Sequence, residues 1–228
     1  MKNRLIAIII LMMPALSLAH EHIIISGGPA LRYHERYKAA SHDKSWANFI
    51  NSAETQIKKI KPKIPSGDTM VWMVYRPGYE TRGKEEHVDA IGIITQKAQE
   101  LGAKLVWFNN RAEFLEYLND NRDDDNLIAR LEYFGHSNKR NWMFDYSNKL
   151  DGASAEPDMF HLWHFNKLAG GIFTENAFCK SWGCHSGEQY SGAWYKRTGR
   201  RMEGAIGKTD YSDGGIPKLS SSSGKWTQ

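Results

Sequence analysis

Cysteine is scarce in this chain of 228 residues, which has only Cys179 and Cys184. Two cysteines exclude the dense disulfide framework of small secreted domains. Their spacing is also not the C-x₂-C pairing that is typical of zinc sites. On one extended strand their Cα atoms would lie about 16 Å apart at roughly 3.3 Å per residue, whereas a disulfide needs less than about 7 Å. We therefore expect two free thiols, since a bridge between them would require a broken strand.

Long apolar runs are missing except at the start of the chain. A short basic segment and the apolar run from Leu5 to Leu18 precede Ala19, with small residues at the −3 and −1 positions. This layout predicts a cleavable signal peptide over residues 1–19. No later segment has the roughly 18 consecutive apolar residues of a membrane-spanning helix, so we expect no stable membrane anchor. The predicted location is the periplasm or the extracellular space.

Neither sign of charge is in large excess. Without Lys2 and Arg4, the 30 basic residues fall to 28, against 26 acidic ones, and the two signs are interspersed. This pattern argues against nucleic acid as a partner, because no basic stripe is present. Residues 20–228 are enough for one domain with a substantial core. We predict a single domain, of undefined oligomeric state, in which the serine-rich tail 218–228 is loose.

Strand-like apolar runs alternate along the chain with segments whose apolar residues keep helical spacing. Such alternation indicates right-handed crossovers and a mostly parallel sheet covered by helices on both faces. We predict an α/β fold, a three-layer sandwich around six strands. The predicted strands are His22–Ser26, Thr69–Tyr75, Lys104–Phe108, Leu127–Phe134, Ala177–Gly183 and Met202–Ile206. The predicted helices begin at Ser41 or Asp43, Lys84, Ala112, Asp158 and Gly187, and end at Ile60, Leu101, Asn121, Leu168 and Thr198.

Two of the predicted strands end in residues that can carry chemistry. Gly135-His136-Ser137 follows the fourth strand, and Gly183-Cys184-His185 ends the fifth. Carboxyl ends of parallel strands meet at one edge of the sheet, so we expect His136 and Cys184 to face each other there. A cysteine needs a nearby base or a helix N-terminus to become a nucleophilic thiolate. Both are expected here, because a helix is predicted to begin at Gly187.

These strand ends resemble those of the caspase-like cysteine peptidases, the superfamily of legumain, gingipain, clostripain and the caspases. In that fold one apolar strand ends in His-Gly and a later one ends in Ala-Cys or Gly-Cys. The resemblance covers roughly residues 127–206, and the segment 141–151 fits the small hairpin that often follows the histidine. It implies a peptide or protein substrate and no cofactor or metal. It also implies Cys184 as nucleophile, His136 as base or proton donor, and an oxyanion hole from the N–H groups of Ser137 and Cys184.

Three further residues are candidates for substrate binding. His185 adjoins the proposed nucleophile, and we expect it to form a wall of the site. Asp210 and Asp213 lie in the polar segment after the sixth strand, where caspase-like folds build part of the P1 side-chain pocket. The resemblance implies that one of these carboxylates receives a basic side chain through charge-assisted hydrogen bonds. The alternative is an ordinary polar loop.

Three other interpretations stay open beside a secreted cysteine endopeptidase acting by acyl transfer. Gly-His-Ser resembles the start of an α/β-hydrolase nucleophile elbow with Ser137 attacking, although the elbow needs small residues after the serine and residues 138–140 are bulky. Zinc is a second possibility, because His161, His164 and His185 accompany the two cysteines, yet without a recognised ligand spacing. The third is a binding protein that has lost turnover. It is favoured by Ser137, because most caspase-like families carry glycine there.

Overall fold

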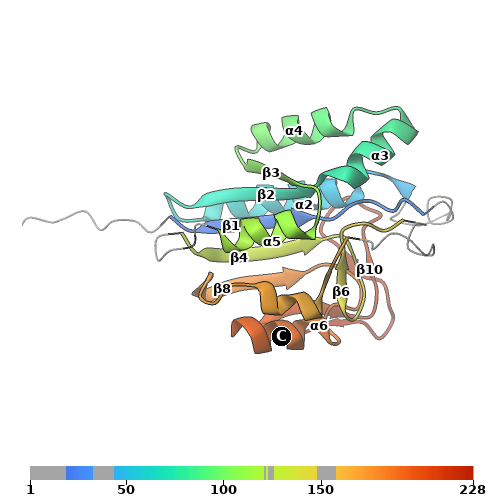
Figure 1. Ribbon diagram of the computed structural model, residues 1–228. Coiled ribbons are helices and arrows are strands. Elements are labelled where there is room, and N and C mark those ends of the chain that lie inside the picture. The colour runs from blue at the N-terminus through green and yellow to red at the C-terminus, as the bar shows by residue number, and fades with distance from the viewer. Residues whose placement is uncertain (1–18, 33–43, 121, 123–125, 148–157, 228) are drawn as a thin grey trace, which may run out of the picture.

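The computed structural model describes residues 19–32, 44–120, 122, 126–147 and 158–227 (Figure 1). The predicted signal peptide lies outside these described residues, apart from Ala19. Among the residues that are described, no helix combines the length and the apolar character needed to cross a membrane.

A seven-stranded sheet with the order β12-β9-β8-β4-β1-β2-β3 forms the centre of the molecule. All neighbouring strands are parallel except β12, which pairs antiparallel with β9. The prediction of an α/β fold around a mostly parallel sheet is therefore confirmed. The strands are β1 (Glu21–Ser26), β2 (Thr69–Tyr75), β3 (Lys104–Phe108), β4 (Ile128–Phe134), β8 (Phe173–Ser181), β9 (Met202–Ile206) and β12 (Lys225–Trp226).

Apolar side chains of the sheet alternate between two buried clusters, as the twofold period of a strand requires. Ile23 and Ile25 of β1 belong to the cluster that includes residues of α5 and α6, whereas Ile24 belongs to the one with α2 and α4. In Figure 1, α2 and α5 lie on opposite sides of the sheet. The α-helices are α2 (Asn48–Ile60), α3 (Arg76–Glu86), α4 (Ala90–Glu100), α5 (Arg111–Asn119) and α6 (Tyr190–Thr198).

Shorter elements complete the described fold. A three-stranded sheet combines β5 (His136–Ser137), β6 (Asn141–Met143) and β7 (Met159–His161), and β10 (Thr209–Asp210) pairs with β11 (Lys218–Leu219). The 3₁₀ helices are η2 (Lys61–Lys63) and η4 (Leu162–Lys167).

The C-terminal tail differs from the prediction of a loose segment over residues 218–228. It forms β11 and β12, and β12 makes the sheet seven-stranded instead of six-stranded. The Trp226 ring helps to hold β12 in place, because the ammonium group of Lys180 lies 4.3 Å from its centroid and 3.7 Å from that of Trp182. A cation close to two aromatic rings is a stabilising arrangement. The serine-rich composition of the tail does not reveal this contact.

Candidate functional site

The two strand ends that carry His136 and Cys184 are direct neighbours. In β4 and β8, Tyr133 pairs in register with Ser181, and the Trp182 N–H continues the ladder by donating to the Tyr133 carbonyl at 2.9 Å. The chain then leaves both strands at the same edge of the sheet. There the Ser137 hydroxyl donates to the Cys184 carbonyl at 2.6 Å. The segment containing the histidine therefore touches the segment containing the cysteine.

His136 begins β5, and only 9% of it is exposed. Its imidazole lies against two aromatic rings, with centroid distances of 4.9 Å to Phe49 of α2 and 4.4 Å to Tyr146. Phe49 in turn packs edge-on against Tyr211 at 4.7 Å. These rings fix the side of the sheet on which the imidazole lies.

Cys184 is partly exposed, and its thiol is free of any disulfide. The hydrogen bonds of its Sγ are made with Thr209, whose backbone N–H donates to the sulfur at 3.4 Å and whose Oγ1 lies 3.5 Å away. An N–H donor favours a thiolate over a thiol. When the sulfur is protonated, it can donate to the Thr209 carbonyl at 3.8 Å. Thr209 is thus the hydrogen-bond partner of the candidate nucleophile.

Tyr211 lies on the side of the sheet where Phe49 packs, and it contacts the strand end that carries His136. Its hydroxyl accepts the Gly135 N–H at 3.3 Å. Burial raises the pKa of Tyr211 well above its ordinary value, and the negative charge that Cys184 carries when ionised raises that pKa further. Phe49 contacts both Tyr211 and His136, so the imidazole and the Tyr211 ring pack against the same aromatic side chain.

Backbone donors are available beside the sulfur. In the described part of the chain, the Cys184 N–H has no hydrogen-bond acceptor. Between β5 and β6, the Asn138 N–H donates to the Asn141 carbonyl at 3.1 Å. Bonded and non-bonded pairs alternate in an antiparallel ladder, so Ser137 and Trp142 form a non-bonded pair and the Ser137 N–H points away from β6. Among the described residues, neither predicted oxyanion donor therefore has a bond to the ladder of the small sheet.

The helix that was expected to support the thiolate begins farther away than predicted. A helix over Gly187–Thr198 was expected, but α6 begins at Tyr190, six positions after Cys184, and the residues between them form turns. The favourable field of a helix N-terminus fades within about one turn. The Thr209 N–H contacts the sulfur instead. No sequence pattern indicates this role, because Thr209 is 25 positions from Cys184 and belongs to no periodic pattern.

His185, the predicted wall of the site, has its ring directed at Glu188. Its Nδ1 lies 2.5 Å from a Glu188 oxygen, and its backbone has a left-handed φ of 59°. The Lys139 ammonium lies 3.1 Å from the other Glu188 oxygen. The hydrogen bond from His185, together with that from Lys139, lowers the pKa of Glu188 to about 2. Glu188 is not among the predicted site residues, although a carboxylate three residues after a histidine is a visible pattern.

This lowered pKa predicts how folding stability depends on pH. An unfolded glutamate titrates near 4.3, so the stabilisation that Glu188 provides is present above about pH 4.3. It is lost as the pH falls from there through the folded-state pKa of about 2. We expect the Glu188→Gln variant to be less stable than the wild type at pH 6 and to converge with it at about pH 2. Urea unfolding at a series of pH values measures this difference. A constant difference from pH 6 to 2 would contradict the prediction.

The two candidate P1 carboxylates have local partners. Asp210 accepts hydrogen bonds from the Ser212 N–H at 2.8 Å and the Ser212 hydroxyl at 3.0 Å. Asp213 is exposed and lies 2.7 Å from the Lys218 ammonium, which lowers the pKa of Asp213. Asp210 directly follows Thr209, the residue that binds the sulfur, whereas Asp213 lies three residues farther along the chain. Of the two, Asp210 is nearer in the chain to the residue that binds the sulfur.

Ser137 and Gly183 fit together closely at the strand ends. A Cβ at Gly183 would lie 2.2 Å from the Ser137 Oγ and 2.8 Å from the Gly135 carbonyl oxygen. Ser137 therefore occupies space between the two segments, and only glycine fits opposite it.

Gly183→Ala is predicted to displace the Cys184 turn and to destabilise the protein by about 1–3 kcal/mol through overpacking. The double variant Ser137→Gly/Gly183→Ala should recover part of this loss, because the hydroxyl contact is gone while the carbonyl contact persists. Urea denaturation of both variants tests the pair. A double variant no more stable than Gly183→Ala would show that Ser137 is not the obstacle.

The histidines considered for zinc have other roles in the structure. His161 Nδ1 accepts the Trp163 N–H at 3.0 Å, and His164 Nδ1 accepts the His161 N–H at 3.1 Å. These bonds cap η4. Within the described residues, no three His, Cys, Asp or Glu side chains are arranged to hold a metal ion. Cys179 is buried in β8, and burial raises its pKa to about 12.

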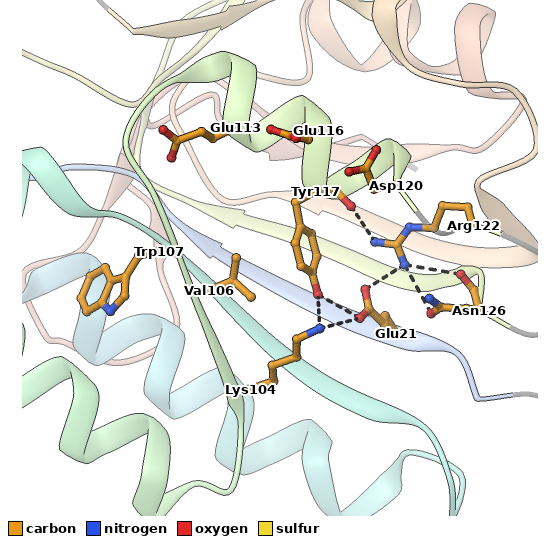
Figure 2. Close-up of a pocket in the computed structure, with 10 residues that line it drawn as sticks. All are labelled: Glu21, Lys104, Val106, Trp107, Glu113, Glu116, Tyr117, Asp120, Arg122 and Asn126. Atoms are coloured by element: carbon orange, nitrogen blue, oxygen red, sulfur yellow. Dashed lines mark hydrogen bonds and ion pairs between the residues drawn. The ribbon is translucent and has the colours of Figure 1, made fainter.

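A separate cavity of about 380 Å³ lies at the opposite edge, where the strands begin (Figure 2). Its polar floor is the Glu21 carboxylate, which accepts the Tyr117 hydroxyl at 2.9 Å and an Arg122 N–H at 2.8 Å. Lys104 lies 3.6 Å from the same carboxylate. The single carboxylate thus faces two cations, and the network joins β1, β3 and the segment after α5. We interpret this cavity as a feature of stability.

Comparisons with models of protein families, with curated proteins and with solved structures found no significant match to this chain. The chemistry of the site therefore rests on its own residues.

Proposed function

We propose that this chain is a cysteine-dependent endopeptidase in which Cys184 is the nucleophile and His136 is its base and proton donor. The observation that carries the proposal is the setting of the sulfur. It is partly exposed at the shared edge of β4 and β8, where it receives the Thr209 N–H at 3.4 Å. A thiolate supported by a donor, with an imidazole on the neighbouring strand end, is the arrangement that nucleophilic cysteine catalysis needs.

The proposed reaction is acyl transfer in two steps. The Cys184 thiolate attacks the peptide carbonyl carbon, and the N–H groups of Ser137 and Cys184 stabilise the resulting oxyanion. The carbon–nitrogen bond then breaks, and the His136 imidazolium gives its proton to the leaving amine. In the second step, neutral His136 takes a proton from water, which attacks the thioester and releases the acid and the thiolate.

The proposal includes a caspase-like three-layer domain that is exported through a signal peptide over residues 1–19. Helices on both faces of the sheet support this fold, as does the β5–β6 hairpin that begins at His136. In this proposal the core of six strands is extended at one edge by β12. Asp210, beside Thr209, is the better placed carboxylate for a basic P1 side chain.

A second candidate function is a binding protein that keeps the scaffold without turnover. The observation in its favour is that the Ser137 hydroxyl fills the space against Gly183 and donates to the Cys184 carbonyl. The hydrolase elbow has less support, because a hairpin rather than a helix follows Ser137. In addition, the Ser137 hydroxyl is already engaged, because it donates a hydrogen bond to the Cys184 carbonyl.

Cleavage of a peptide library by the wild type and by Cys184→Ala tests the proposal. We expect cleavage that depends on Cys184 and His136 and is unaffected by Cys179→Ser, whose position is buried in β8. Cleavage that persists in Cys184→Ala would exclude the cysteine mechanism. No cleavage by the wild type, together with saturable binding of library peptides, would favour the binding protein.

A further inference from the structure

Glu188 connects three segments that border the candidate site. One of its carboxylate oxygens lies 2.5 Å from His185 Nδ1 and accepts the Gly207 N–H at 3.4 Å, and the other lies 3.1 Å from the Lys139 ammonium. His185 belongs to the turn after Cys184, Lys139 to the β5–β6 turn, and Gly207 to the end of β9. The groups that face this carboxylate are therefore an imidazole, an ammonium and a backbone amide.

Each of these segments supplies one component of the site. The turn at His185 follows the nucleophile directly. The β5–β6 turn follows Ser137, whose N–H is the second oxyanion donor and whose hydroxyl binds the Cys184 carbonyl at 2.6 Å. Gly207 lies two residues before Thr209, whose N–H reaches the sulfur at 3.4 Å. A single side chain thus contacts the supports of the nucleophile, the oxyanion donor and the sulfur-binding amide.

The turn after Cys184 has a backbone conformation that needs such support. His185 adopts a φ of 59°, a left-handed value that costs energy in a residue other than glycine. Two contacts hold it there, since its N–H donates to the Gly207 carbonyl at 2.7 Å while its ring meets Glu188. Without the Glu188 side chain, the His185 side chain would lose this contact, and the backbone bonds of His185 to Gly207 and residue 188 would be left to hold the turn.

We propose, on the basis of the cysteine-peptidase function above, that Glu188 is a positioning residue that holds the Cys184 turn, the β5–β6 turn and the end of β9 in their catalytic arrangement. It acts through His185, Lys139 and Gly207 and does not itself contact the reacting atoms. Its loss should let Thr209 and Cys184 move apart, so that the sulfur spends less time as a supported thiolate.

The test is the alkylation rate of Cys184 by iodoacetamide at pH 6 and pH 9, followed by peptide mapping. We expect Glu188→Gln to slow labelling about tenfold at pH 6. This corresponds to a thiolate fraction about ten times smaller than in the wild type. Labelling at pH 9 should change little, because an ordinary cysteine is largely ionised there. Glu188→Asp keeps the charge but shortens the reach, and it should also slow labelling at pH 6.

The matched control is Glu203→Gln, which also lies on β9 but forms its ion pair, at 2.9 Å, with Lys180 of β8 instead of with the three segments. It should label like the wild type. If His136→Ala slows labelling while Glu188→Gln does not, the positioning role is wrong and the peptidase proposal stands. If Cys184 of the wild type reacts no faster than an ordinary thiol at pH 6, the peptidase proposal itself fails. A normal rate in Glu188→Asp would reduce the role of Glu188 to its charge and overturn the positioning claim.

Discussion

Replacing His136 with alanine is expected to slow the alkylation of Cys184 at pH 6 by about 100-fold. An ordinary cysteine is well under 1% thiolate at that pH, whereas a cysteine paired with an imidazolium is mostly ionised. The imidazole lies on the strand end next to the one that carries the sulfur, so its loss should leave the Thr209 N–H as the main support of the thiolate. Quantitative peptide mapping after timed exposure to iodoacetamide measures the rate.

Two comparisons separate this effect from damage to the fold. Cys179 is 2% exposed and should stay unlabelled in both proteins, which makes it an internal reporter of unfolding. His87→Asn is the matched control. His87 is exposed at the end of α3 with a φ of 54°, and asparagine tolerates that conformation. Equal rates in the wild type and His136→Ala would show that the imidazole does not activate the sulfur.

Replacing Arg122 with methionine is expected to reduce the free energy of unfolding by about 3 kcal/mol, the cost of leaving a buried charge without its partner. The Arg122 side chain is 4% exposed and lies 2.8 Å from the Glu21 carboxylate, whose side chain is 8% exposed (Figure 2). Tyr117 and Lys104 would still face that carboxylate, so the loss should stay at the lower end of the range for buried pairs. Urea denaturation with linear extrapolation measures the change.

The control for this prediction is Arg76→Met. Arg76 also pairs with a glutamate, at 2.7 Å from Glu80, but both side chains are more than 40% exposed. Exposed pairs contribute less than about 1 kcal/mol, so this variant should be nearly as stable as the wild type. The double variant Glu21→Leu/Arg122→Met should lose less than Arg122→Met, because it buries no unpaired charge. Equal losses for Arg122→Met and Arg76→Met would contradict the role assigned to the Glu21 network.

Local patterns were sufficient to predict most of the sheet. The six predicted strands are all present because apolar, β-branched runs such as Met70–Val74 have few alternatives to a buried parallel strand. Helix ends were less accurate. Residues 84–101 were predicted as one helix, yet His87 turns left-handed and Asp89 caps a new helix by accepting the Gly92 N–H at 2.9 Å. The apolar spacing continues across this break and hides it.

Non-local contacts caused the other differences. Residues 158–168 were predicted as a helix, but Phe160 pairs with Trp142 across the small sheet, and a 3₁₀ helix follows. Helix α3 follows β2 directly, with Pro77 at an early position of the helix, where its missing N–H is tolerated. In the site, His136 and Cys184 could be predicted to share one edge, because the carboxyl ends of parallel strands meet there. Thr209, Tyr211 and Glu188 were missed because their roles depend on contacts between distant segments.

The most direct measurement is the identity of the residue that carries the acyl group during turnover. The wild type would be mixed with peptide p-nitrophenyl esters, quenched in acid and digested for mass spectrometry. We predict that the added acyl mass lies on the peptide containing Cys184 and is absent from Cys184→Ala. An acyl group on Ser137, or ester hydrolysis with no label on Cys184, would contradict the proposed mechanism.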